Sequence, residues 1–282
     1  MSNRVLVVGL NPFDSGKTGV SIQLIQRMKD SRAVEFFKPI SGHNYWYRHE
    51  HTQFCLENKQ LVSYDATRVR RVYQSRLHDF VANPVHALYV PARLQTPGKA
   101  PLSTLALAGW DSVLAMERMS HPQGNRVEST MMIARDLIQK EQLLLTPEQA
   151  DRLSSGIKLR PVTRLEEVQN NENDCFERYV SESFNGIERS SDSVVIESFN
   201  DSAWPWEGLD RVETVLAVGP GHVFTYEPEK FRLAVFLSKH ESGPVREVTF
   251  ARIADMLKPL KKVALVPGEG LTDEAFRDLH VV

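Results

Sequence analysis

The first residues that could carry chemistry follow an apolar run near the start of the chain. The run Val5–Val8 leads into a turn rich in Asn, Pro and Asp, and Gly16, Lys17 and Thr18 then open a predicted helix. Backbone N–H groups at a helix start attract phosphate oxygens, a lysine reaches the outer phosphates, and a threonine hydroxyl binds Mg²⁺. The stretch therefore predicts a phosphate-binding loop, in preference to an ordinary turn in which Lys17 is solvated.

This loop departs from the usual pattern at one position. The usual pattern has a glycine, then four residues, then the Gly-Lys pair. Here Asn11 stands at the position of that first glycine. Asn adopts positive φ at modest cost, so we expect Asn11 to replace the glycine. The residues that we expect to contact the nucleotide here are Asn11, Asp14, Ser15, Gly16, Lys17, Thr18 and Gly19.

Further polar side chains follow other predicted strands. Lys38 and Ser41 come after the second strand, Asp65 opens a helix, and Glu197 ends the strand "SVVIES". In an open α/β sheet, ligands bind at the carboxyl ends of the strands, so we expect these residues near the loop. Each also has a plainer interpretation: Lys38 as a solvated strand end, Asp65 as a helix cap, and Glu197 as the partner of a surface arginine.

Strands and helices alternate along much of the chain. Apart from Glu35, the predicted strands are β-branched or apolar, as strands buried on both faces are. They are Val5–Val8, Ala33–Phe37, Val194–Ile196, Thr214–Val218, Leu233–Leu237 and Val263–Val266. The predicted helices are Lys17–Lys29, Thr67–Phe80, Asp174–Ser183 and Val248–Leu257. This order predicts an α/β protein with a doubly wound, mostly parallel sheet and helices on both faces.

The middle of the chain departs from this alternation. Residues 82–110 contain four prolines and predict a long loop, whereas "DSVLAMERMS" and "NRVESTMMIA" around "HPQG" predict a β-hairpin. Thr146, Pro147 and Gln149 predict a capped helix start, and residues 168–175 an exposed connection between helices. We therefore expect a single domain over 1–282, with an insertion at about 111–190.

Two aromatic stretches have no assigned role. The segment "GHNYWYRHEH" holds His43, His49 and His51, but with no cysteine or carboxylate spaced to complete a metal site we expect a mobile aromatic loop. Trp204 and Trp206 in "AWPW" form either a stacking wall for a ligand or a packed loop.

Composition limits the classes of function. A formal net charge of −2 gives no general attraction to nucleic acid or to anionic lipid. Cys55 and Cys175 are too few and too far apart to indicate a disulfide framework. The first apolar run is too short to span a membrane or to form a signal-peptide core. We expect a soluble cytoplasmic protein.

The motifs together resemble the dethiobiotin synthetase group of P-loop proteins, which includes the cobyrinic acid amidase-ligases and related ATPases. The stretches that carry the likeness are "GLNPFDSGKT", "FKPISG", "SYDAT" and "VVIESFND". The nearest likeness within this group is to an uncharacterised archaeal-type branch of predicted P-loop ATPases or GTPases. Residues 111–190 have no clear counterpart, and "FNDSAWPWEG" follows Glu197 in place of a glycine-rich turn.

The resemblance implies a role for each matching residue. Lys17 would hold the outer phosphates of ATP or GTP, while Thr18, Asp65 and Glu197 would surround Mg²⁺. We expect ATP in preference to GTP, because the guanine-specific pattern Asn-Lys-x-Asp has only a distant echo here, in "LSKHE". Lys38 and Ser41 would face the substrate and the transferred phosphoryl group, so that Lys17, Lys38 and Glu197 would be catalytic.

The resemblance also bears on recognition and assembly. Ser238 would contact the base, and the chain would form a homodimer, which the methionine-rich hairpin also favours. An ATP-dependent ligase or carboxylase-like enzyme acting on an unidentified small molecule, and a nucleotide-switched ATPase or GTPase acting on a protein partner, both remain open.

Overall fold

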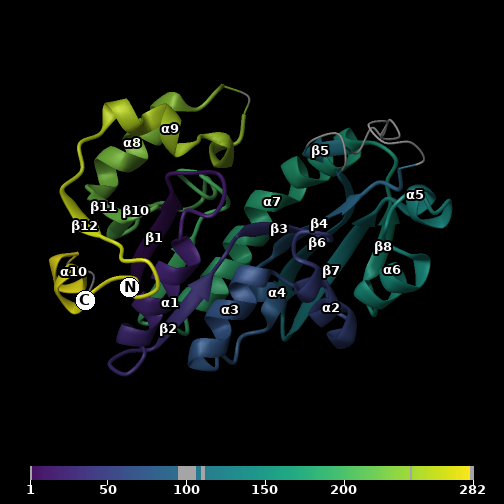
Figure 1. The fold of residues 1–282 in the computed structure, drawn as a ribbon, viewed down its shortest axis with the longest axis horizontal. Helices are drawn as coiled ribbons and strands as arrows, with labels where there is room; N and C mark the ends of the chain where they lie inside the picture. The colour runs from purple at the N-terminus through teal and green to yellow at the C-terminus, as the bar shows by residue number, and fades with distance from the viewer. Residues whose placement is uncertain (1, 95–105, 109–111, 242, 280–282) are drawn as a thin grey trace. The chain divides into compact units, whose positions relative to one another are not determined.

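The computed structural model describes residues 2–94, 106–108, 112–241 and 243–279 (Figure 1). The protein is α/β and contains two mixed sheets. It divides into two compact units. The first unit is built from Met1–Ile40, Asp65–Leu77 and Ser183–Val282, and the second from Ser41–Tyr64 and His78–Glu182. The single domain with an insertion at about 111–190 stays a prediction.

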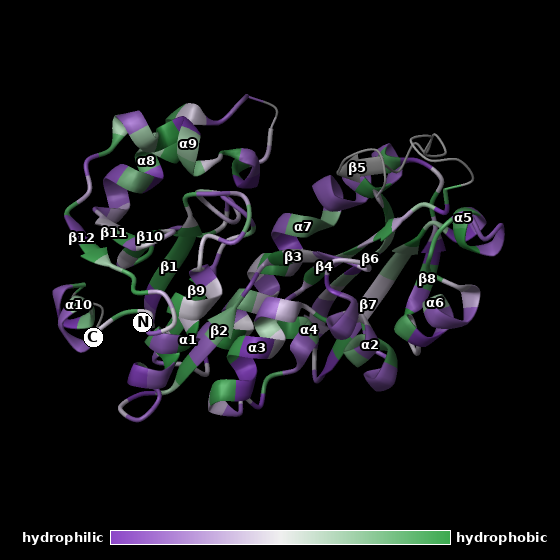
Figure 2. Cartoon of the chain, viewed as in Figure 1, coloured by the Kyte–Doolittle hydropathy of each residue, from purple (hydrophilic) through white to green (hydrophobic). Residues whose placement is uncertain are grey.

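The sheet of the first unit has the strand order β12-β11-β10-β1-β9-β2. Its strands are β1 (Asn3–Gly9), β2 (Val34–Phe37), β9 (Ser193–Glu197), β10 (Thr214–Gly219), β11 (His222–Tyr226) and β12 (Lys261–Ala264). The pairs β10-β1, β1-β9 and β9-β2 are parallel, whereas β11 pairs antiparallel with β10 and with β12. The runs Val5–Val8 of β1 and Val194–Ile196 of β9 are apolar and fully buried, as expected of strands covered on both faces, and β1 appears green in Figure 2.

Helices of the first unit supply the rest of its core. They are α1 (Lys17–Met28), α3 (Tyr64–Tyr73, whose first residue belongs to the second unit), α8 (Pro228–Ser238), α9 (Phe250–Ile253) and α10 (Asp273–Asp278). Short 3₁₀ turns lie at Val245–Glu247 and Ala254–Met256. In α1, Val20, Leu24 and Met28 recur at helical spacing and are fully buried in the same apolar cluster as β1. This packing fixes the start of α1 relative to the end of β1.

The second unit contains a sheet of mainly antiparallel strands. Its order is β3-β4-β6-β7-β8, with β5 (Ala106–Ala108) pairing with β6. The strands are β3 (Ile40–Asn44, whose first residue belongs to the first unit), β4 (Val85–Pro91), β6 (Ser112–Gln123), β7 (Arg126–Ile133) and β8 (Lys158–Pro161). The predicted hairpin is confirmed: β6 and β7 pair antiparallel up to Gln123 and Arg126, and Gly124 takes a φ of 59° in the turn between them.

Helices also belong to this unit within the described residues. They are α2 (His49–Asn58), α4 (Asp79–Ala82), α5 (Arg135–Gln139), α6 (Pro147–Leu153) and α7 (Leu165–Glu188), the last continuing into the first unit. The predicted start of α6 is confirmed, because the Thr146 hydroxyl accepts from the Gln149 N–H and the Gln149 side chain accepts from the Thr146 N–H. No helix in the described part of the chain combines the length and the apolar character needed to cross a bilayer.

Two predicted elements take a different form. Leu233–Leu237 is helical, because Pro228 and the Glu227 carboxylate, which accepts from two backbone N–H groups, start α8 upstream of it. The predicted helix Thr67–Phe80 is interrupted between Tyr73 and Asp79. Apolar residues alone could not distinguish a short buried strand from a buried helix face.

Three predicted loops are also regular structure. The range 82–110 contains β4, with prolines next to it and at its end, and its residues 95–105 and 109–110 lie outside the described part. Residues 168–175 lie inside α7, where their polar side chains are mostly at the helix surface. The histidine-rich segment forms β3, a turn and the start of α2, so the prediction of a mobile loop there is wrong.

Two groups of apolar side chains are buried within their own units. Trp204 and Trp206 are fully buried, and the Trp206 ring meets the Phe37 ring edge-on, with 5.6 Å between the ring centroids. This confirms the packed-loop interpretation. The hairpin methionines Met116, Met119, Met131 and Met132 are at most 1% exposed. The homodimer therefore stays a prediction, without the support of an uncovered hairpin face.

The capping of α6 yields a test of its contribution to stability. We expect Thr146→Ala to lower the free energy of unfolding by about 1 kcal/mol, because the Gln149 N–H loses its acceptor. Thr146→Ser keeps the hydroxyl and is the matched control. Chemical denaturation of the three proteins measures the difference, and equal stability of the alanine and serine variants would contradict it.

Candidate functional site

The loop between β1 and α1 is fixed at its start and ends in a glycine with positive φ. The Leu10 N–H donates to the carbonyl of Val218 on β10, which fixes the start of the loop. Gly16 precedes α1 with a φ of 93°, a left-handed conformation that glycine adopts without strain. Among the described residues no side chain caps this helix start. The first N–H groups of α1 are thus left to other acceptors.

Lys17, the first residue of α1, folds back over the end of β1. Its Nζ donates to the backbone carbonyl of Asn200 at 2.6 Å and to Oγ of Ser15 at 3.2 Å. A Cβ on Gly9 would lie 2.7 Å from both Nζ and that carbonyl oxygen, so this approach requires glycine. Burial, assisted by the charge of Lys38, lowers the pKa of Lys17 to about 8.

Glu197, at the end of β9, lies at the centre of a group of polar contacts. Its side chain is fully buried. Oε1 accepts from Nζ of Lys38 at 2.6 Å and from the Thr18 hydroxyl at 3.1 Å, and Oε2 accepts from the Ser21 hydroxyl at 2.9 Å. Both carboxylate oxygens are therefore hydrogen-bonded, which is the condition for keeping a charge in the interior.

Lys38 joins a second carboxylate to the first. Its Nζ lies 2.8 Å from Oδ2 of Asp65, and its side chain is almost completely buried. Burial alone would lower the pKa of Lys38, but Asp65 and Glu197 outweigh it and hold that pKa above its ordinary value. Burial likewise opposes ionisation of Asp65, and Lys38 holds the pKa of that carboxyl below its usual range. The three groups form a charged triad.

The sheet order explains why these residues meet. β1 lies between β10 and β9, and β9 lies between β1 and β2. Val7 of β1 is opposite Glu197 of β9, while Lys38 directly follows β2. Three parallel strands thus end side by side, and each carries one part of the site at its carboxyl end.

Some predicted residues have other surroundings. Asn11 is exposed and does not have a positive φ. In this loop the non-glycine residue with a positive φ is Asp14, at 50°. The prediction that Asn11 replaces the glycine is therefore wrong. Gly19 is exposed in the first turn of α1. Ser238 ends α8 and its hydroxyl contacts Sδ of Met256 at 3.4 Å, with no strand at this place.

Ser41 belongs to the second unit. Its hydroxyl lies 3.0 Å from Oδ1 of Asn83 and 2.6 Å from Nδ1 of His86, both of the same unit. These contacts engage the hydroxyl that the sequence assigns to the substrate.

Two contributors were not predicted. Ser21 lies one helical turn after Lys17 and three residues after Thr18, a spacing that places it on the same helix face. That spacing was a usable signal. Asn200, in the turn after β9, has a φ of 48° and contributes only its backbone carbonyl. Because every residue carries a backbone carbonyl, the residue type could not indicate this contact.

The pKa of Lys17 predicts a pH dependence of stability. Between about pH 8 and pH 10.5 the unfolded chain holds the Lys17 proton and the folded chain has lost it, so this group makes stability rise with pH. Relative to Lys17→Met, the free energy of unfolding of the wild type should increase by on the order of 3 kcal/mol across this range. Denaturation of both proteins at several pH values measures the difference, and a constant difference would contradict it.

The triad predicts an asymmetry between single and double substitutions. Lys38→Met should lower the free energy of unfolding by about 3–5 kcal/mol, because the fully buried Glu197 loses its counter-ion. Lys38→Met combined with Glu197→Gln removes the buried charge as well and should recover part of this loss. Urea denaturation tests both, and a double variant less stable than Lys38→Met would refute this account.

Comparisons with known proteins do not place the chain in a family. No family model, no curated protein and no solved structure matched it. The resemblance to the dethiobiotin synthetase group stays a prediction, and the function has to be inferred from the arrangement of the residues.

Proposed function

We propose that the first unit binds a nucleoside triphosphate with Mg²⁺, ATP in preference to GTP, and hydrolyses it, as a doubly wound P-loop NTPase does. The observation that carries the proposal is the hydrogen bond between Thr18 and Glu197 beside the buried Lys17. It joins the start of α1 to the end of the neighbouring strand β9. Residues that the sequence predicted for one site thereby lie in one cluster.

The loop offers two attractions for phosphate. The uncapped N–H groups at the start of α1 carry the positive end of the helix dipole. The Lys17 ammonium donates to two neutral oxygens, the Asn200 carbonyl and the Ser15 hydroxyl. Exchange of those neutral acceptors for a phosphate oxygen would strengthen the contact, because hydrogen bonds between charged groups are shorter and stronger.

The donor set suits Mg²⁺. Thr18 supplies a hydroxyl oxygen, and Asp65 and Glu197 supply carboxylate oxygens, the ligand type that Mg²⁺ prefers. Thr18 would hold the ion, Asp65 would face it, and Glu197 would act through the Thr18 hydroxyl or a water. A bound Mg²⁺ would neutralise phosphate charge and orient the triphosphate.

The resemblance implies transfer of the γ-phosphoryl group to a small molecule, with Lys38 and Ser41 at the substrate. One observation favours the second candidate, a nucleotide-dependent switch for a protein partner. The Lys38 ammonium forms ion pairs with two carboxylates, and the Ser41 hydroxyl forms hydrogen bonds with Asn83 and His86. Both predicted substrate groups are therefore engaged elsewhere. Stimulation of hydrolysis by a metabolite would support the ligase-type reaction, and stimulation only by protein from a cell extract would support the switch.

Nucleotide binding tests the shared part of both candidates. We expect Lys17→Ala to weaken binding of Mg²⁺-ATP by about tenfold or more and to abolish hydrolysis, because a charge-assisted contact to phosphate is lost. Lys29→Ala, directly after α1, is the matched control and should bind as the wild type does. Titration calorimetry measures affinity. Equal affinity of wild type and Lys17→Ala for both ATP and GTP would rule the proposal out.

A further inference from the structure

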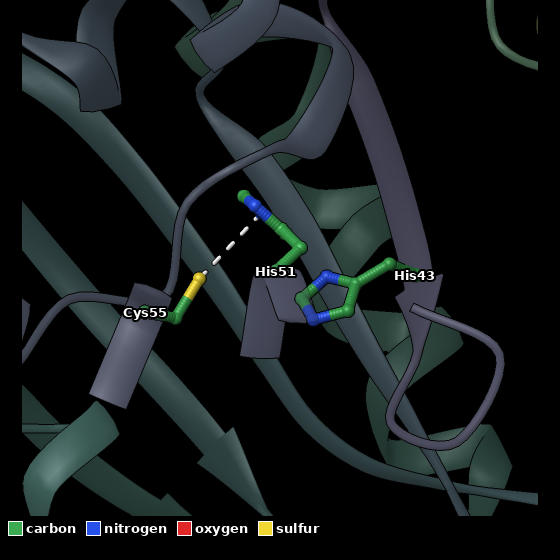
Figure 3. A group of neighbouring side chains, drawn as sticks. All are labelled: His43, His51 and Cys55. Atoms are coloured by element: carbon green, nitrogen blue, oxygen red, sulfur yellow. Dashed lines mark hydrogen bonds between the residues drawn. The ribbon is translucent and has the colours of Figure 1, made fainter. Parts of the chain in front are cut away.

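The second unit holds a buried group of metal-binding side chains. His43 comes from β3, and His51 and Cys55 come from α2, as Figure 3 shows. One ligand atom of each lies within 4.8 Å of the others, and the three residues are 5%, 6% and 0% exposed. Cys55 thus lies beside the two histidines, a neighbour that the sequence spacing did not indicate. Because His49–Asn58 is a helix, His51 and Cys55 stand one turn apart on the same face.

We propose that His43, His51 and Cys55 bind a Zn²⁺ ion whose fourth position is taken by a water molecule. Two imidazoles and a thiolate are ligands that Zn²⁺ takes in proteins, whereas Mg²⁺ and Ca²⁺ prefer oxygen. Zn–S and Zn–N bonds of about 2.3 and 2.0–2.1 Å at a tetrahedral angle place sulfur and nitrogen about 3.6 Å apart. Sγ of Cys55 lies 3.6 Å from Nε2 of His51. This pair already has the separation of two ligands on one ion.

Hydrogen bonds behind the cluster orient His43. Its Nδ1 lies 2.8 Å from Nε2 of His86, whose Nδ1 lies 2.6 Å from the Ser41 hydroxyl, and that hydroxyl contacts Asn83. A metal-binding histidine characteristically uses its second ring nitrogen in this way, which fixes the tautomer and the ring orientation. Nε2 of His43, 3.2 Å from the Thr52 hydroxyl, is then the nitrogen for the metal.

The contacts on the other side are those of protonated, metal-free ligands, and Zn²⁺ would replace the Val62 carbonyl oxygen as the partner of both. Nε2 of His51 lies 2.8 Å from the Val62 carbonyl oxygen, and Sγ of Cys55 lies 3.7 Å from the same atom. When Zn²⁺ binds, the S–H bond breaks, a Zn–S bond forms and one proton leaves to solvent. The His51 proton moves from Nε2 to Nδ1, so the ring stays neutral. The sum is one Zn²⁺ taken up and one proton released.

The ion would join a strand to a helix inside the second unit. β3 and α2 are separated only by the turn after Asn44, and the ligands come from both. Since a formed site exists only in the folded chain, binding stabilises the fold. This site does not depend on the proposed nucleotide function, because all of its residues belong to the second unit.

Cobalt substitution of the full chain tests the site. We expect the metal-free wild type to bind one Co²⁺ per chain with a tetrahedral spectrum and a sulfur-to-cobalt charge-transfer band, and Zn²⁺ to displace it. Cys55→Ser should remove the sulfur band, and His51→Gln should weaken binding by more than about a hundredfold. The matched controls are Cys175→Ser, the chain's other cysteine, and His49→Gln, an exposed histidine of the same helix.

A measurement on the wild type alone covers the case in which the variants do not fold. Zn²⁺ should raise its thermal midpoint relative to chelator-treated protein, and Mg²⁺ at the same concentration should not. A Co²⁺ spectrum without the sulfur band, a band of equal strength in Cys55→Ser, or a midpoint unchanged by Zn²⁺ would each overturn the proposal. In that case the three residues form a purely hydrogen-bonded core.

Discussion

The carboxylate of Glu197 is the constraint on which the first unit depends. A charge without solvent contact costs several kcal/mol unless other groups compensate it. The compensation comes from Thr18 and Ser21 on α1 and from Lys38 after β2, and Lys38 in turn holds Asp65 at the start of α3. Elements from four places in the chain are thereby required to meet at one end of β9. The neighbouring order of β1, β9 and β2 satisfies this requirement.

Much of this arrangement follows from the sequence. Runs of mostly apolar residues mark the buried centre of the sheet, so β1, β2, β9 and β10 could be predicted together with the polar residues at their ends. The meeting of Lys17, Thr18, Lys38, Asp65 and Glu197 follows from strand ends that share one edge. The details could not be derived. Asn200 contributes a backbone carbonyl, which every residue type carries, and Asn11 and Asp14 both tolerate positive φ, so residue type does not decide which of them adopts it.

The second unit was harder to predict because local patterns there compete. The prolines around β4 indicated a loop, although prolines next to a strand and at its last residue leave its interior intact. In the histidine-rich segment, the distance between His51 and Cys55 has chemical meaning only if the backbone is helical. Once the segment is taken as a loop, the spacing loses its meaning. A wrong assignment of secondary structure therefore conceals a site as well as an element.

The pairing of β1 with β10 has a consequence for synthesis of the chain. Val5 lies opposite Thr214, so the first unit cannot complete its sheet until most of the polypeptide has left the ribosome. All residues of the second unit, which ends at Glu182, are made before β9 and β10. The middle of the chain can thus fold first while β1 and β2 wait for their partners. Pairing between such distant parts of the chain is slow and leaves strand edges unpaired, which exposes the nascent first unit to aggregation.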